Sequence, residues 1–322
     1  SRFGTETPQP FTRLDGTPPG GGQVTGSKAN FQIIAGSISV LLSAFCFYLS
    51  TATIRWGQLH GIHPDPSFYV LVRFLLGFVV IAGLLIAQRR PPRPVNYHLL
   101  AGRAVANSVA VYCFYQAVQT TSVAHANILN MTYPVFVALI TWGFLPEQRE
   151  GRTLLALLAA FAGIVLILYP GELSMDVHHL WGLGSGISAA LAIVYLNLSR
   201  KLHDSETVLF YMFGLGSVLI YAGFHEHMVI RREGDVLYLV VCGAFGIAGQ
   251  YFITLGFRFI TAVEGSILSS TRILMAAFLG PLIGLDPALV LHGWLGALLI
   301  FGANVYLALR KTGAGRPGRQ AR

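Results

Sequence analysis

Charged residues are scarce in this sequence. Of its 322 residues, 11% are Asp, Glu, Lys or Arg, and 54% are hydrophobic. An ordinary soluble domain has about one quarter of its residues charged. So few charged residues cannot cover the outer surface of a folded chain. The outer surface must therefore face lipid. The composition excludes a water-soluble globular domain.

Cysteine is scarce as well. Cys46, Cys113 and Cys242 fall inside apolar runs and form no CxxC pair, so no disulfide framework or thiolate metal site is expected. The histidines at 178–179 and 225–227 have no Cys or acidic cluster at ligand spacing. The sequence therefore predicts no metal site and no cofactor.

The apolar residues fall into runs long enough to cross a membrane. A spanning helix needs about 20 apolar residues, because the hydrocarbon core is about 30 Å thick and each helical residue rises about 1.5 Å. About ten such runs are present, at 31–54, 67–88, 99–118, 122–144, 154–169, 180–199, 207–224, 236–257, 262–285 and 289–309. The predicted fold class is an all-α integral membrane protein with about ten transmembrane helices.

The two ends of the chain differ from this pattern. Residues 1–30 are rich in Pro, Gly and Thr and are predicted to be a disordered N-terminal tail, and residues 310–322 form a basic C-terminal tail. The first apolar run is too long for a signal-peptide core, and no small-residue cleavage site follows it. We therefore expect this run to be retained as a span.

Positive charge is distributed unevenly between the connections. With both termini inside, 16 of the 22 Lys and Arg residues lie in inner segments, three in outer segments and three within spans. This bias follows the positive-inside rule and predicts a multi-pass protein of the cell (inner) membrane with cytoplasmic N- and C-termini. The positive charges behind the net charge of +8 lie between apolar runs. This distribution indicates a lipid bilayer as partner and no nucleic acid.

The two halves of the chain resemble each other. Shifted by 139 residues, the third and fourth spans align with the eighth and ninth. The identical pairs, in order, are Tyr112 with Tyr251, Ile128-Leu129 with Ile267-Leu268, Thr132 with Thr271, and Ala138 with Ala277. With five spans in each half, the second half enters the membrane with opposite polarity. The pattern predicts two inverted five-helix repeats, 31–169 and 180–309, which are typical of secondary transporters with a midplane substrate site.

Segments near the end of the first half resemble a known family. The fourth span contains Thr132-Tyr133-Pro134-Val135-Phe136 and is followed by Leu145-Pro146-Glu147, and the fifth span closes in Tyr169-Pro170-Gly171. Together with the last span, at 293–302, these segments resemble the drug/metabolite transporter superfamily in its ten-helix EamA branch. The resemblance implies a secondary transporter, expected to be an exporter, that moves a small organic metabolite by alternating access.

Two other classes of function stay open at this point. One is a non-transporting scaffold or assembly subunit, which the inverted repeat disfavours. The other is a membrane-embedded enzyme, which would need His clusters for iron, paired acidic motifs for Mg²⁺ or a GxSxG nucleophile motif. The sequence contains no His cluster or paired acidic motif at the required spacing, and no GxSxG motif stands before a plausible base. We predict a carrier and not an enzyme.

Arg272 is the leading candidate for binding the substrate. It lies ten residues into its span, about 15 Å deep, where a guanidinium costs roughly 2.5–3.5 kcal/mol on insertion scales. Its helical face is small and polar and includes Ser269. A cation at the midplane predicts a carboxylate-bearing solute such as an amino acid or organic anion. The alternative is a structural pair with a carboxylate or with helix-end carbonyls.

The fourth span carries further candidates for the substrate site. Tyr133 is the repeat-equivalent of Arg272, and Asn127 and Asn130 share its helical face. Pro134 removes a backbone donor and predicts a break or kink, which is a usual sign of a transporter site. The alternative is that these polar residues join helices to each other.

Five other polar residues complete the set of candidates. Gln116 and Gln250 are predicted to line the cavity, and Arg73 either joins the site or extends to the outer surface. His125 and Glu264 are repeat-equivalents that titrate, so they are candidates for proton coupling. Their alternative is an interfacial position just inside the headgroups.

Single cysteines at two connections test the predicted orientation. Ser205→Cys is expected to react with a membrane-impermeant thiol reagent only from the inside, and Glu233→Cys only from the outside, because the charge bias places these connections on opposite sides. Labelling of both positions from the same side would contradict the topology.

Overall fold

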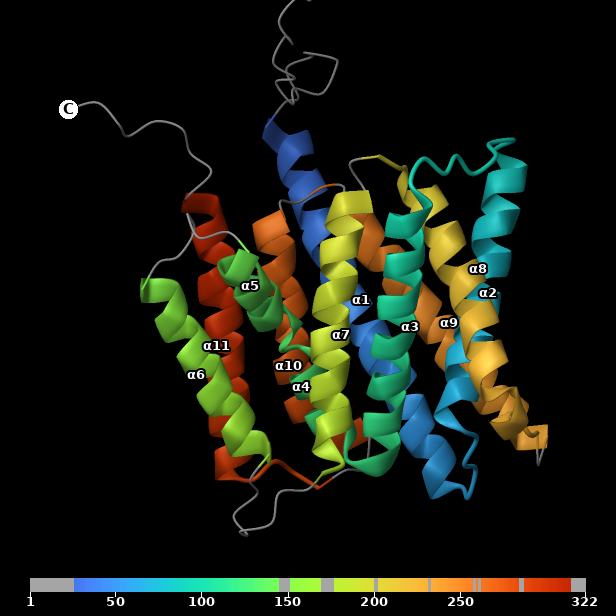
Figure 1. Ribbon diagram of the computed structural model, residues 1–322. Helices are drawn as coiled ribbons and strands as arrows, with labels where there is room; N and C mark the ends of the chain where they lie inside the picture. Colours follow the sequence, from blue (N-terminus) through green and yellow to red (C-terminus); the bar gives the residue numbers. More distant parts are fainter. Residues whose placement is uncertain are drawn as a thin grey trace, which may run out of the picture.

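The computed structural model of the chain is a bundle of helices (Figure 1). It describes residues 26–144, 151–168, 177–199, 202–230, 233–256, 259, 262–283 and 287–313. Within these ranges every regular element is helical. The predicted all-α class is confirmed.

The helices match the predicted spans one by one. Their bounds are α1 Gly26–Leu59, α2 Pro66–Ala87, α3 Tyr97–Thr120, α4 Val123–Asn130, α5 Tyr133–Phe144, α6 Gly151–Leu168, α7 His179–Ser199, α8 Ser205–Phe224, α9 Glu233–Gly256, α10 Ala262–Ile283 and α11 Leu291–Gly313, with a short 3-10 turn η2 at His225–His227. The helices α4 and α5 together occupy the predicted fourth span. Ten spans are therefore built from eleven α-helices in the described ranges.

Three expectations about where helices begin and end are corrected. Residues 26–30, predicted to be disordered, are helical in α1, and α11 continues to Gly313, past the predicted end of the last span. Arg55, expected in an outer connection, lies within α1. Hydropathy marks only the lipid-facing part of a helix, whereas its backbone hydrogen bonds can continue beyond the hydrocarbon core. The remaining tail residues, 1–25 and 314–322, lie outside the described ranges.

Polar side chains start several helices. Asp65 caps α2 by accepting from the amide of Ser67, and Asn96, Ser122 and Asp204 do the same at the starts of α3, α4 and α8. An N-cap satisfies one of the four backbone donors that a helix leaves free at its start. The short connections between the spans are thereby fixed by local sequence.

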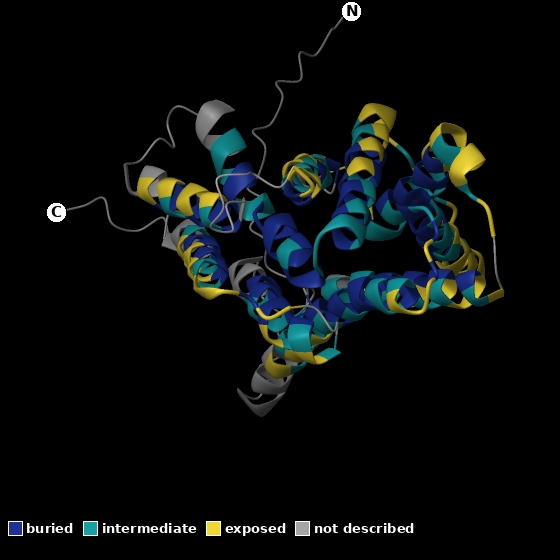
Figure 2. Ribbon diagram, turned by 90° about the horizontal axis from the view of Figure 1, so that it is seen from below, coloured by how far each residue is buried: buried dark blue, intermediate teal, exposed yellow. Residues whose placement is uncertain are grey.

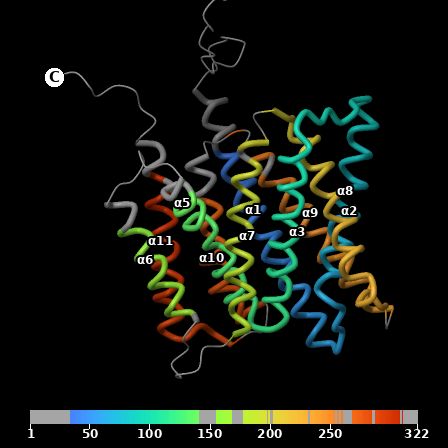
Figure 3. Tube along the Cα trace, in the orientation of Figure 1, coloured from blue at the N-terminus to red at the C-terminus, as the bar shows by residue number. Residues whose placement is uncertain are grey.

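The helices run alternately up and down the bundle (Figures 1 and 3). The start of α1 and the end of α11 lie at the same end of the bundle, as an even number of spans requires (Figure 1). The helix α7 starts at the opposite end from α1 (Figure 1). Since α7 opens the second half, that half enters the bundle with inverted polarity.

The outer surface of the bundle is apolar. Exposed residues lie mostly on the outward faces of the helices and buried residues on the inward faces (Figure 2). The outward-facing Val79, Leu155, Val218 and Leu237 are between 63% and 66% exposed. A surface of this kind suits lipid and not water, so the chain is a multi-pass membrane protein.

Six described segments are long and apolar enough to cross a membrane on their own, and three shorter apolar helices accompany them. The helix α3, which carries Arg103 and Gln116, is not among these nine. It packs against α1, α2, α4, α7 and α8. Arg103 is buried and Gln116 is half-buried among these helices, and enclosure by protein is how polar residues are tolerated at membrane depth.

The helix contacts follow a two-fold pattern between the halves. If α1 corresponds to α7, α2 to α8, α3 to α9, α4 and α5 to α10, and α6 to α11, then the contact of α3 with α7 matches that of α9 with α1. The contact of α2 with α9 likewise matches that of α8 with α3. The equivalent helices α2 and α8, α4 and α10, and α6 and α11 also pack on each other. Such pairing is what a pseudo-two-fold axis produces, although the bounds 31–169 and 180–309 stay predictions.

Two aligned threonines make the same hydrogen bond. Thr132 Oγ1 donates to the carbonyl of Leu129, and Thr271 Oγ1 donates to the carbonyl of Leu268, each at 2.6 Å. Both pairs are related by the shift of 139 residues that aligned the sequence. The alignment therefore brings structurally equivalent positions together.

The predicted break at Pro134 is present. The helix α4 ends at Asn130 and α5 begins at Tyr133. The carbonyl of Met131, at the break, accepts a hydrogen bond of 2.8 Å from Asn304 Nδ2 of α11, so a side chain replaces a backbone donor there. The repeat-equivalent helix α10 continues without a break through Arg272, so the two halves differ at this level.

The small-residue motif of α7 packs helices together, as expected for GxxxG. A Cβ at Gly186 would lie 2.8 Å from the carbonyl oxygen of Leu129, and one at Gly182 would lie 2.9 Å from the Leu129 Cβ. These glycines let α7 approach the end of α4 closely. That approach positions Ser185, on the same helix, next to the break.

Candidate functional site

Two buried arginines from different halves meet at one aromatic ring. The guanidinium carbons of Arg73, in α2, and Arg272, in α10, lie 5.5 and 5.6 Å from the ring centroid of Phe47 in α1. Arg73 is 7% exposed and Arg272 is 6% exposed. The helices α1 and α2 belong to the first half and α10 to the second. We call Arg73 and Arg272 the arginine pair.

Arg272 is held by an amide and by aromatic rings. Its Nη2 donates a hydrogen bond to Asn130 Oδ1 at the end of α4. The Nδ2 of Asn130 in turn donates to Ser185 Oγ of α7 at 2.5 Å. The guanidinium also lies 5.4 Å from the ring centroid of Phe114, where the negative face of the ring attracts a cation.

Arg73 is held by a chain of hydroxyl groups. Its Nη1 donates to Tyr115 Oη at 3.0 Å, and Tyr115 Oη is 3.1 Å from Ser50 Oγ. Ser50 Oγ lies 2.9 Å from the carbonyl oxygen of Cys242 on α9, to which it donates. The side chain of Arg73 therefore points into the bundle, and its predicted alternative of extending to the outer surface is wrong.

A glycine on α9 makes room for Arg73. A Cβ at Gly246 would lie 2.9 Å from both Cδ and Nε of Arg73, and one at Gly243 would lie 3.3 Å from its Cα. Contacts below 3.0 Å would force the arginine to move. The close approach of α9 to α2 thus depends on residues without a side chain.

The arginine pair has no acidic partner in the described ranges. Each guanidinium makes one hydrogen bond there, to a neutral group, although it carries five N–H donors. The Nε atoms of both arginines are buried without a hydrogen-bond partner among the described residues. The two positive charges repel each other. Such a site can neutralise and hydrogen-bond an anion.

Two further predicted residues lie near Arg272. Tyr133 opens α5, is half-buried and lies within electrostatic reach of Arg272. Ser269 is buried on α10 about one turn before Arg272, and its Oγ has no hydrogen-bond partner among the described residues. Two hydroxyl-bearing side chains therefore lie in the neighbourhood of Arg272.

Three other predicted residues lie apart from the described contacts of the arginine pair. Asn127 is fully buried and its Nδ2 donates to Thr51 Oγ1 at 3.1 Å and to the carbonyl of Val123 at 2.8 Å. Its amide thus joins α4 to α1, which is the helix-joining alternative. Gln116 and Gln250 are half-buried in α3 and α9.

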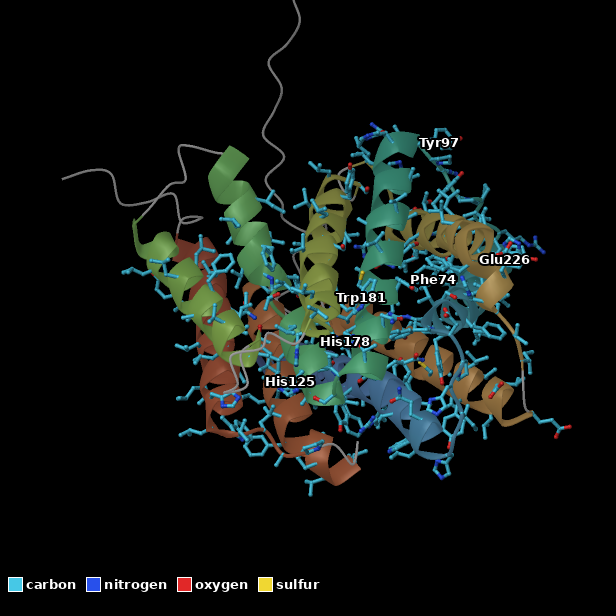
Figure 4. The ribbon with its side chains drawn as sticks, turned by 60° about the horizontal axis from the view of Figure 1, so that its bottom comes forward. Phe74, Tyr97, His125, His178, Trp181 and Glu226 are labelled. Atoms are coloured by element: carbon cyan, nitrogen blue, oxygen red, sulfur yellow. The ribbon has the colours of Figure 1, made fainter. Side chains whose placement is uncertain are left out.

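Of the two candidates for proton coupling, His125 lies far from the start of α3 (Figure 4). His125 and His178 lie close together at the end of the bundle opposite Tyr97 (Figure 4). The His125 ring contacts the His179 ring, with centroids 4.9 Å apart, and its Nδ1 lies 2.7 Å from Ser122 Oγ. Glu264 belongs to α10, but its side chain lies outside the described part of the structure.

Several residues of the site were not singled out from the sequence. Phe47, Ser50, Phe114, Tyr115 and Ser185 are aromatic or hydroxyl residues of types that occur in most spans. Only their contacts with the arginine pair distinguish them. The spacing of Phe47 and Ser50 could have identified them as neighbours, because residues three apart lie on one face of a helix such as α1.

Metal ligation has no support in the described residues. They contain no group of three or more His, Cys, Asp or Glu side chains that could hold a metal ion. The three cysteines are buried and unpaired with each other.

Removal of one hydroxyl tests the support of Arg73. Tyr115→Phe is expected to lower the free energy of unfolding by about 1.5–3 kcal/mol, because a buried guanidinium loses its hydrogen bond. Tyr69→Phe is the matched control, since Tyr69 packs edge-on against Tyr115 and its Oη is buried without a described partner. Thermal unfolding in detergent measures both. Equal effects would show that the Arg73 contact contributes nothing.

Comparisons with known proteins agree with this architecture. The EamA-like transporter family model matches the chain twice, at residues 34–169 and 177–309. An uncharacterized transporter of Helicobacter pylori is 26% identical over 287 residues, covering 86% of this chain and 95% of the relative. The pseudopaline exporter CntI of Pseudomonas aeruginosa is 24% identical over 255 residues, covering 76% of this chain and 84% of the relative.

A solved crystal structure shares the fold. It superposes with a TM-score of 0.55 at 16% sequence identity, and the match covers 90% of this chain and 99% of that structure. The double family match, the ten spans and the two-fold contact pattern agree with the resemblance noted in the sequence. The chain belongs to the EamA-like transporter family and is a membrane transporter.

Proposed function

We propose that this transporter carries a small organic anion, an amino acid or organic acid, whose carboxylate binds Arg272. The observation that carries the proposal is the buried Arg272 guanidinium, which contacts a neutral amide and no carboxylate among the described residues. An unpaired charge in the membrane interior is costly, and it persists where it has a functional role. A substrate carboxylate would supply the missing negative charge.

The geometry of arginine supports a carboxylate in particular. A guanidinium offers parallel N–H groups that can hold both oxygens of one carboxylate, which an ammonium cannot do. Arg272 uses Nη2 for Asn130 and leaves its Nε without a partner among the described residues. Tyr133 and Ser269 add two hydroxyl groups beside it, which suit the remaining polar groups of an amino acid or hydroxy acid.

The position of the site supports alternating access. Its residues come from both halves, with Asn130 on α4, Arg272 on α10 and Ser185 on α7. A substrate at the junction of two inverted repeats is exposed to one side or the other as the halves rock. The break between α4 and α5 gives the first half a hinge next to the site.

The proposed direction is export across the cell (inner) membrane, with both termini in the cytoplasm. The excess of Lys and Arg in the segments assigned to the inside supports the orientation. The name of one relative, an exporter, supports outward transport. His125 and Glu264 remain proposed proton-coupling residues, because an imidazole or a carboxylate can take up a proton as its access to water changes.

Substitution of Arg272 tests the proposed function. Flux in proteoliposomes against a panel of amino acids, organic acids and amines identifies the transported anion. Arg272→Ala is expected to reduce its transport almost completely, and Arg272→Lys substantially, because loss of a buried charge-assisted pair costs about 2–5 kcal/mol of binding. Arg89→Ala, in the exposed turn that follows α2, is expected to transport like the wild type.

A structural role for Arg272 would give a different result. In that case Arg272→Ala would lower the yield of folded protein, while the fraction that folds would transport at the wild-type rate. Wild-type flux of all solutes by well-folded Arg272→Ala protein would overturn the proposal, as would transport of amines but of no acid.

A further inference from the structure

We propose that the site binds two separate anionic groups of one solute, one at Arg73 and one at Arg272, so that the substrate is a short organic dianion such as a dicarboxylate. This inference rests on the proposed function, because it takes the anion site at Arg272 as given. It adds a second charge and a chain length to the substrate.

The first observation is that both cations share one ring. The guanidinium carbons of Arg73 and Arg272 lie 5.5 and 5.6 Å from the centroid of Phe47, so their separation cannot exceed the sum of these two distances. A chain of a few carbons between two carboxylates can cover that range, since each C–C bond adds about 1.5 Å. The arginine pair is therefore within reach of one small solute.

The second observation is that each arginine has its own polar support. Arg73 donates to Tyr115, which also contacts Ser50, while Arg272 donates to Asn130, which contacts Ser185. The two sets share no residue. Each set holds one guanidinium in place separately, which suits two anionic groups that are some distance apart.

The third observation is the balance of charge. No carboxylate pairs with either arginine in the described ranges, and the two charges repel each other. A solute with one carboxylate would leave one buried positive charge uncompensated in a medium where charges interact strongly. A dianion neutralises both cations and removes their repulsion.

The fourth observation is the apolar surface beside the two cations. The rings of Phe47, Phe114 and Tyr115 all lie within 5.9 Å of one or both guanidinium carbons, as measured to their centroids. Methylene groups of a dicarboxylate can pack against such rings without leaving polar groups unpaired. The site thus combines two cationic ends with an aromatic wall.

A matched pair of solutes tests the second charge directly. Glutarate and monomethyl glutarate have the same backbone and differ by one negative charge. We expect wild-type protein in nanodiscs to bind glutarate at least about tenfold more tightly by calorimetry, because only glutarate pairs with both arginines. Succinate and adipate, each with its monomethyl ester, extend the comparison to other lengths.

Substitution of Arg73 assigns the second charge to that residue. Arg73→Gln is expected to bring the affinity for glutarate to within about threefold of that for the monoester, while the monoester affinity stays near the wild-type value, since a single charge is lost. Arg73→Lys keeps the charge and is expected to keep a preference for glutarate, which gives a second reading if Arg73→Gln folds poorly.

Several outcomes would overturn the dianion proposal. Equal affinity of wild-type protein for each diacid and its monoester would do so, and the proposed carboxylate site at Arg272 would then still stand. An equal loss of both affinities in well-folded Arg73→Gln protein would give Arg73 a structural role only. Tighter binding of methyl phosphate than of any diacid would place both charges on one group. If no acid binds, the proposed function itself fails.

Discussion

The buried positive charge of Arg272 is the constraint on which the rest of the site depends. A guanidinium inside a lipid-surrounded bundle must be hydrogen-bonded and must be compensated by negative charge or by aromatic faces. The chain supplies one hydrogen-bond acceptor, Asn130 Oδ1, and the aromatic faces of Phe47 and Phe114. Among the described residues it supplies no acid. In the proposed function, the missing negative charge comes with the solute.

The fold brings these groups together through its two-fold construction. The helices α4 and α10 are repeat-equivalents that pack on each other, so residues of the two equivalent segments meet between the halves. The break after Asn130 turns the end of α4 towards Ser185, and Gly246 lets α9 approach Arg73. The two-fold arrangement positions the helices. Residues that differ between the halves, such as Arg73 and Arg272, provide the charged groups of the candidate site.

Much of the fold and part of the site could be predicted from the sequence. The spans are set by hydropathy, the break by Pro134 and the repeat by identities such as Thr132 with Thr271. Arg272 was recognisable because a charge at that depth is costly. Phe47, Tyr115 and Ser185 were not, because such residues are common in spans and only tertiary contacts distinguish them. Asn127, predicted on the same helical face, joins helices through its amide, since the face of a helix does not reveal which neighbour packs on it.

Introducing a carboxylate beside Arg272 by mutation most directly tests the central claim that, among the described residues, no carboxylate of the chain pairs with Arg272. Asn130→Asp places a carboxylate where Asn130 Oδ1 now accepts from Arg272, and Asn127→Asp, one turn earlier on α4, is the control without an arginine partner. The account predicts that Asn130→Asp raises the unfolding temperature and weakens glutarate binding at least about tenfold, while Asn127→Asp lowers the unfolding temperature. A lower unfolding temperature for Asn130→Asp, with wild-type glutarate binding, would contradict it.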